Sequence, residues 1–189
     1  MILLAWVVLV LVAAERLAEL FISQRHTKVL LAEGAFEVGR CHYPLIVAVH
    51  TLWIAALFTW AATRPVSVAV PWLAVYLAIQ ILRVWVMASL GRYWTTRIIV
   101  APQAPLIRTG PYRFLRHPNY VVVVAEIIVL PMVFGAWQIA ALFTVLNAIA
   151  LWIRIRAENQ ALAPRAALSS AAGPTTTAPP SDRSSATLR

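Results

Sequence analysis

The chain has 189 residues, of which 61% are hydrophobic and only 12% are charged. Soluble domains contain roughly 45–50% apolar and about 25% charged residues, so this composition excludes an ordinary soluble globule and indicates an integral membrane protein. The net charge of +9 could suit a nucleic-acid partner, but nearly all basic residues lie in short loops beside apolar stretches, where retention on the cytoplasmic side explains them.

Metal and nucleotide signatures are missing from the sequence. A single cysteine, Cys41, allows neither an internal disulfide nor a cysteine-based metal site. The histidines show no zinc-ligand spacing, and the six glycines form no phosphate-binding loop. We therefore predict no metal site and no nucleic-acid partner, and any nucleotide-like cofactor would bind without a Rossmann fold.

Residues 1–22 form the first predicted membrane helix. No basic segment precedes the apolar stretch as it would in a signal peptide, so we interpret the helix as retained. Glu15 and Glu19 are four residues apart and share one face, which we expect to point into the bundle. Residues 23–42 would be a polar connector with an interfacial helix that stops at Gly34.

Four further apolar stretches predict membrane helices, at residues 45–62, 70–90, 118–134 and 137–153. At ~1.5 Å per residue, the last two are just long enough for a hydrocarbon core of ~30 Å. Pro44 would stand at the first position of the second helix, and Pro131 would kink or end the fourth. Because only Gly135 and Ala136 separate the last two helices, we expect these helices to form an antiparallel hairpin.

The positions of lysine and arginine predict the orientation. The segments 16–42, 63–69, 91–117 and 135–136 and the tail after residue 153 carry four, one, five, none and five of them. By the positive-inside rule, the N-terminus would lie outside, and both long loops and the tail in the cytoplasm. We therefore predict an all-α protein of the inner membrane, a bundle of about five transmembrane helices with a cytoplasmic cofactor pocket. Residues 1–162 would form this domain, and residues 163–189, rich in Ser, Thr, Ala and Pro, a disordered tail.

The segment 110–120 reads GPYRFLRHPNY and carries most of the candidate chemistry. His117 and Pro118 predict a helix start, whose free N–H groups and positive dipole end can hold a carboxylate. The predicted hairpin would bring Arg154 and Glu158 beside this helix start. A helix end, an arginine, a carboxylate and two tyrosines would suit a zwitterionic ligand with an amino-acid end and a ribose.

The pattern Gly-x-Tyr-x₃-Arg-His-Pro-x-Tyr, followed by Arg-x₃-Glu, is similar to the core of the isoprenylcysteine carboxyl methyltransferase family. The resemblance spans roughly residues 70–162 and implies an integral membrane enzyme that uses S-adenosylmethionine. The residues that it implies around the cofactor are Leu106, Ile107, Tyr112, His117, Pro118, Tyr120 and Glu158. Arg154 would face the acceptor, and Arg154 and Glu158 are the predicted catalytic residues.

Three departures from the family pattern bear on the acceptor. Val122 stands where the family has glycine, Asn159 replaces the second acidic residue after Glu158, and the later Phe-Gly and paired tyrosines are absent. In these respects the chain resembles a bacterial branch associated with type III polyketide synthases, similar to O-methyltransferases of alkylresorcinols and alkylpyrones. We therefore expect O-methylation of a polyketide-derived phenolic lipid that enters from the bilayer.

Several alternatives stay open at this point. The acceptor could be an isoprenylated cysteine carboxylate or a phospholipid amine, and the chain could be a non-catalytic lipid-binding membrane protein. A phenol acceptor would gain from a general base, and the candidates are His42, Glu15, Glu19 and Glu126. Arg83 and Glu126 lie within spans, where they either serve function or pair with each other or with Glu15 and Glu19.

Overall fold

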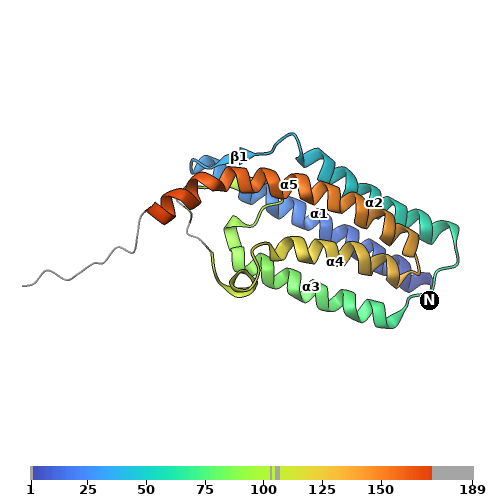
Figure 1. Ribbon diagram of the computed structural model, residues 1–189. Coiled ribbons are helices and arrows are strands. Elements are labelled where there is room, and N and C mark those ends of the chain that lie inside the picture. The colour runs from blue at the N-terminus through green and yellow to red at the C-terminus, as the bar shows by residue number, and fades with distance from the viewer. Residues whose placement is uncertain (1, 103, 105–106, 172–189) are drawn as a thin grey trace, which may run out of the picture.

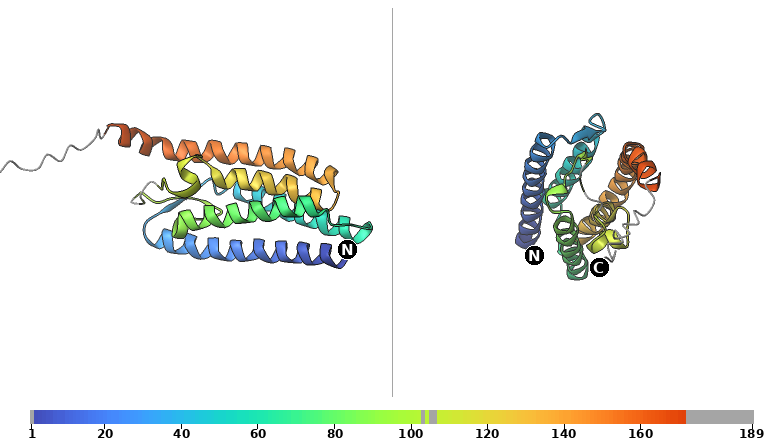
Figure 2. Two further views of the ribbon diagram at one scale, coloured as in Figure 1. Left: turned by 90° about the horizontal axis from the view of Figure 1, so that it is seen from below. Right: turned by 90° about the vertical axis from the view of Figure 1, so that its left-hand side faces the viewer.

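The computed structural model describes residues 2–102, 104 and 107–171, with side chains up to residue 158. Its main elements are five long helices, α1 (Ile2–Ala32), α2 (Tyr43–Thr63), α3 (Val70–Leu90), α4 (Pro118–Val133) and α5 (Trp137–Ala171). They run up and down in one bundle, so that the connectors after α1 and α3 lie at the same end as the C-terminal half of α5 (Figure 1). Two perpendicular views place α1 and α5 on opposite sides of the bundle (Figure 2).

The helices are long and apolar, and many of their large apolar side chains are exposed. Within the described ranges, three segments are long and apolar enough to cross a membrane, namely Tyr43–Thr63, Val70–Tyr93 and Trp137–Glu158. Large apolar side chains such as Ile81 and Trp152 are more than half exposed, and lipid would cover them. Helix α4 is apolar but has only 16 residues, and acidic and basic residues interrupt α1. The structure therefore fits an all-α integral membrane protein.

The predicted bounds agree best with the observed ones for α2 and α3. Helix α3 has the predicted bounds, and α2 has its proline in the first turn. Helix α1 instead continues to Ala32, so much of the predicted connector is part of it, and the chain turns at Gly34 with φ 89°. Helix α5 continues past residue 153 to Ala171, and residues 172–189 of the predicted tail lie outside the described part.

A short antiparallel ribbon is an element that the sequence analysis did not anticipate. Strand β1 (Phe36–Val38) pairs with β2 (Ile98–Val100). Arg97 Nη1 donates to Glu37 Oε1 at 2.7 Å and holds the ribbon from the side. The ribbon ties the connector after α1 to the loop after α3, at the end of the bundle where β1 is labelled in Figure 1.

A buried ion cluster joins α1, α3 and α4. Glu19, Arg83 and Glu126 are at most 6% exposed. The Arg83 guanidinium donates to both carboxylates, with Nη2 2.6 Å from Glu19 Oε2 and Nη1 2.5 Å from Glu126 Oε2. Arg16 also contacts both, 3.0 Å from Glu19 and 3.2 Å from Glu126, and Gln80 donates to Glu126 at 2.8 Å. These ion pairs hold the three helices together. The prediction that Arg83 and Glu126 could pair with each other or with Glu19 is therefore confirmed.

The connection between α4 and α5 is the predicted tight hairpin. Gly135 has φ 67°, a conformation that few other residues adopt readily. The Ala136 N–H donates to the Pro131 carbonyl at 2.9 Å, and α4 ends two residues after this proline. The hairpin places the start of α4 beside residues 154–158 of α5.

Candidate functional site

The start of α4 is built around a stacked pair of rings. His117 has a φ of −132° and precedes the helix. Pro118 lies in the first helical turn, where backbone N–H groups have no partner within the helix, so its missing N–H costs no hydrogen bond. The His117 and Tyr120 ring centroids are 5.2 Å apart and the planes are 17° from parallel. The stack fixes the direction of the Tyr120 side chain, which points from α4 toward α5.

The Tyr120 hydroxyl connects the two parts of the sequence motif. It donates a hydrogen bond to the Glu158 carboxylate and accepts one from Arg154 Nε at 2.9 Å. Arg154 is only 9% exposed. Arg154 and Glu158 are therefore bridged through a tyrosine and are not an ordinary solvated ion pair.

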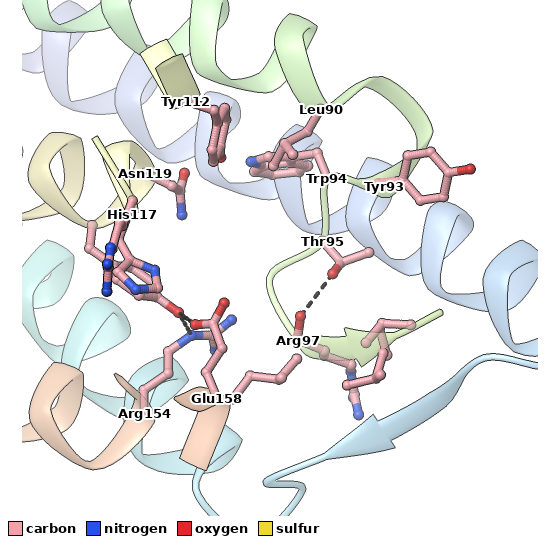
Figure 3. A pocket seen from close by; sticks show the side chains of 15 residues that line it. Leu90, Tyr93, Trp94, Thr95, Arg97, Tyr112, His117, Asn119, Arg154 and Glu158 are labelled. Carbon is pink, nitrogen blue, oxygen red and sulfur yellow. Dashed lines mark hydrogen bonds between the residues drawn. The ribbon is translucent and has the colours of Figure 1, made fainter. Parts of the chain in front are cut away.

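A cavity of ≈ 230 Å³ lies next to this bridge. Among the predicted site residues, the structure brings Tyr112, His117, Tyr120, Arg154 and Glu158 together around it (Figure 3). Pro118, which is buried, and Ile107, which is half-buried, are not among the residues that line the cavity. Leu106 lies outside the described residues.

Tyr112 reaches the cavity from η2 (Gly110–Arg113), which packs closely on α3. Gly110 has φ 56°, and a Cβ at this position would overlap the Ser89 hydroxyl. Glycine thus lets η2 approach α3. Burial, together with the nearby Glu158 carboxylate, raises the pKa of the Tyr112 hydroxyl. The hydroxyl therefore stays a hydrogen-bond donor at neutral pH.

Two buried polar atoms beside the cavity have no partner within the described structure: the Trp94 indole N–H and Asn119 Oδ1. Trp94 is 3% exposed, and His26 Nδ1 donates to its carbonyl at 2.8 Å. Figure 3 shows Trp94 and Asn119 along one side of the pocket and Arg154 and Glu158 along the other. Unpaired buried donors and acceptors are costly, so these atoms indicate a polar ligand. Neither residue was predicted from the sequence.

A second cavity of ≈ 360 Å³ lies between α1 and α2 on one side and α4 and α5 on the other. Its lining is mainly apolar, with Leu20, Ile46 and Val123 as examples. Leu17 and Val47 also line it and are exposed on the outer surface, so the cavity reaches the side of the bundle. The residues that line both cavities are Trp94, Asn119, Tyr120 and Arg154.

None of the four side chains predicted as candidate general bases is free to accept a proton in the larger cavity. Glu19 and Glu126 belong to the ion cluster, and Glu15 lies 3.3 Å from Arg16. The His42 Nδ1 atom is buried without a partner beside Gly39, outside both cavities. Only Glu19 lines the second cavity, where its carboxylate is occupied by arginines. None of the four combines access to this cavity with a free basic atom.

The residues around the smaller cavity fit S-adenosylmethionine in chemical type. Arginines suit its carboxylate, a carboxylate suits its ammonium group or ribose, and aromatic rings suit its adenine and sulfonium. The side chains that offer these groups are Tyr93, Trp94, Arg97, Tyr112, Arg116, Asn119 and Glu158. The unpaired Trp94 and Asn119 atoms supply a donor and an acceptor in addition.

Comparisons with known proteins identify the family. The sequence model of the isoprenylcysteine carboxyl methyltransferase family matches residues 72–164. The chain is 37% identical over 160 residues to the protein YpbQ of Bacillus subtilis, described as uncharacterized, across 83% of this chain and 95% of the relative. It is 27% identical over 155 residues to an uncharacterized protein of Haemophilus influenzae, across 80% of this chain and 90% of that protein. No solved structure matches the chain significantly.

Proposed function

Because this chain belongs to the isoprenylcysteine carboxyl methyltransferase family, and is in that sense a membrane methyltransferase, we propose that it methylates a lipophilic acceptor. The methyl donor is S-adenosylmethionine in the ≈ 230 Å³ cavity, and the acceptor occupies the ≈ 360 Å³ cavity. The observation that carries this proposal is the shared wall of Trp94, Asn119, Tyr120 and Arg154. A polar and an apolar cavity that meet at four residues suit a polar donor and a lipid acceptor.

The chain's main task in this reaction is alignment. S-adenosylmethionine, when bound, supplies a methyl group on a positively charged sulfur that is already a good leaving group. Holding the acceptor oxygen in line with that group is worth several kcal/mol, up to roughly 7–11 kcal/mol for ideal geometry. Glu158, fixed by Tyr120, would hold the ammonium or ribose of the donor, and Tyr112 would donate a hydrogen bond. Arg154 would orient the acceptor oxygen at the shared wall.

The first-choice acceptor is a polyketide-derived phenolic lipid. The mainly apolar lining of the larger cavity and its opening between α1 and α2 support a ring with a hydrocarbon chain that arrives through the bilayer. A second candidate is the carboxylate of an isoprenylated cysteine. Arg154 favours it, because a buried guanidinium at the shared wall is the usual partner of a carboxylate.

The proposed location is the inner membrane, with the smaller cavity on the cytoplasmic side. The loop before α4, which carries five arginines, contributes to the lining of the smaller cavity, and it lies at the same end of the bundle as the connector before α2 (Figure 1). This end would face the cytoplasm by the positive-inside rule.

Calorimetry with S-adenosylmethionine and the detergent-purified protein tests the function. We expect micromolar binding that Glu158→Ala weakens at least tenfold, with Glu33→Ala, half-exposed in the turn after α1, as the matched control. Extracting lipids from cells with and without the gene would then identify the acceptor as a lipid that differs by one methyl group. A folded wild-type protein without affinity for S-adenosylmethionine would favour a non-catalytic membrane protein.

A further inference from the structure

His50 lies on α2 and lines the larger cavity. Its Nδ1 atom lies 2.9 Å from the Ile46 carbonyl oxygen one turn earlier. A carbonyl can only accept a hydrogen bond, so Nδ1 carries the proton. The neutral ring therefore has its lone pair on Nε2, and this atom has no hydrogen-bond partner among the described residues.

The other ionisable groups that line this cavity cannot serve as a base. Glu19 is held by Arg83 and Arg16. The Tyr43 hydroxyl shares a hydrogen bond with Thr96 at 3.1 Å, and Tyr120 is bound to Glu158 and Arg154. His50 thus carries the one free basic atom among the described residues around this cavity.

We propose that His50 is the general base of the methyl transfer, and that the acceptor carries an O–H group whose proton must be removed. The inference rests on the proposed function of the two cavities. A carboxylate acceptor is ionised already and needs no base, whereas a phenol, with a pKa of about 10, is protonated at neutral pH. A base among the residues that line the acceptor cavity therefore favours the phenolic class over the carboxylate.

The acceptor O–H bond breaks and its proton forms an N–H bond at His50 Nε2. The oxygen's electron pair forms a bond to the methyl carbon, and the electrons of the carbon–sulfur bond stay on sulfur, which leaves S-adenosylhomocysteine. The imidazolium then releases its proton to water as the product departs.

Charged side chains from the neighbouring helices surround His50. Arg16 on α1, Arg83 on α3 and Glu126 on α4 all act on its charge, and Glu19 lines the same cavity. Arg16 also lines the cavity, and its buried Nε–H has no partner. This N–H can donate to the acceptor oxygen as negative charge develops there.

A chromophoric ligand measures proton transfer without the cofactor. The probe is a 4-nitrophenol with a long alkyl chain, whose absorbance distinguishes phenol from phenolate. Bound to the wild type below the probe's own pKa, it should show the phenolate band, and in His50→Gln only the phenol band. Thr59→Val, a change on the exposed face of α2, should behave as wild type. A phenolate band that persists in His50→Gln, or its absence in the wild type, would overturn the proposal.

Turnover with substituted acceptors gives a second, independent readout. For an unsubstituted alkylphenol, His50→Gln should lower the transfer rate by about 100-fold or more. The loss should shrink to a few-fold for the nitro-substituted alkylphenol above its pKa, while S-adenosylmethionine affinity stays unchanged. An equal loss for both acceptors would refute the role of His50 alone. A wild-type protein that binds S-adenosylmethionine but methylates no acceptor, or does not bind it, would instead refute the proposed function.

Discussion

Arg154 Nε donates a 2.9 Å hydrogen bond to the Tyr120 hydroxyl, which joins the middle of α5 to the start of α4. The same hydroxyl donates to Glu158. One phenol thus holds a cation on one side and an anion on the other, in the wall between the two cavities. Its loss should affect the donor side and the acceptor side together.

Replacing Tyr120 with phenylalanine should therefore weaken S-adenosylmethionine binding by roughly 10–100-fold. The change keeps the ring that stacks on His117 and removes only the hydroxyl, and a hydrogen bond to a charged group contributes about 1.5–3 kcal/mol. Calorimetry measures the affinity. Phe114→Leu, on a side chain 76% exposed near the site, is the control. Unchanged affinity in Tyr120→Phe would show that the hydroxyl does not shape the cofactor pocket.

Gly110→Ala should displace η2 and with it Tyr112. The new Cβ would overlap the Ser89 hydroxyl, in addition to the strain of about 1–2 kcal/mol for φ of 56°. Gly135→Ala is the matched control, because its φ of 67° gives a similar strain while nothing lies within 4 Å of its Cβ. We expect both variants to lose stability in a thermal melt, but only Gly110→Ala to lose cofactor affinity. Equal S-adenosylmethionine affinity in the two variants would show that Tyr112 does not contribute to cofactor binding.

Val123→Trp should fill the larger cavity and block the acceptor. Val123 lines this cavity, whereas Val121, two residues earlier on α4, is 49% exposed and lines neither cavity. The expected result is a KM for acceptor raised at least tenfold with S-adenosylmethionine affinity unchanged, and no such effect in Val121→Trp. The measurement is initial rate against acceptor content of the detergent micelle. A loss of cofactor binding with normal acceptor KM would reverse the assignment of the two cavities.

Arg83→Leu should destabilise the bundle by about 3–5 kcal/mol, because Glu19 and Glu126 would be left with less positive charge in a buried setting. Arg92 forms an exposed pair with Glu33, and Arg92→Leu should cost less than about 1 kcal/mol. Unfolding of both variants in detergent, followed by circular dichroism, provides the comparison. A small effect of Arg83→Leu would mean that other groups satisfy the two carboxylates.

Helices α2, α3 and α4 could be predicted because each follows from a continuous apolar stretch bounded by local signals, whereas α1 and α5 continue past their apolar stretches. The prolines at the start of α2 and α4 and the glycine between α4 and α5 are such signals, and they act on neighbouring residues alone. The ribbon could not be predicted in this way. Each strand has three residues, too few for an alternating pattern, and the partners are about sixty residues apart.

The site was predictable to the extent that a spaced motif identified it. The motif and the hairpin together indicated that His117 and Tyr120 would lie near Arg154 and Glu158, and the structure brings these four residues together. Trp94, Asn119 and His50 could not be singled out. Trp94 and Asn119 stand out only because each has an unpaired buried polar atom at the wall between the cavities. His50 stands out only because a backbone carbonyl fixes its tautomer beside the larger cavity.

The ion cluster also sets an order for the assembly of the protein. Glu19 is synthesised 64 residues before its partner Arg83, and Arg16 is synthesised 110 residues before Glu126. During this interval α1 carries charges that the hydrocarbon interior disfavours. Helix α1 can therefore complete its ion pairs only after α4 has been made, so the larger cavity, which α1 helps to enclose, is completed late in biogenesis.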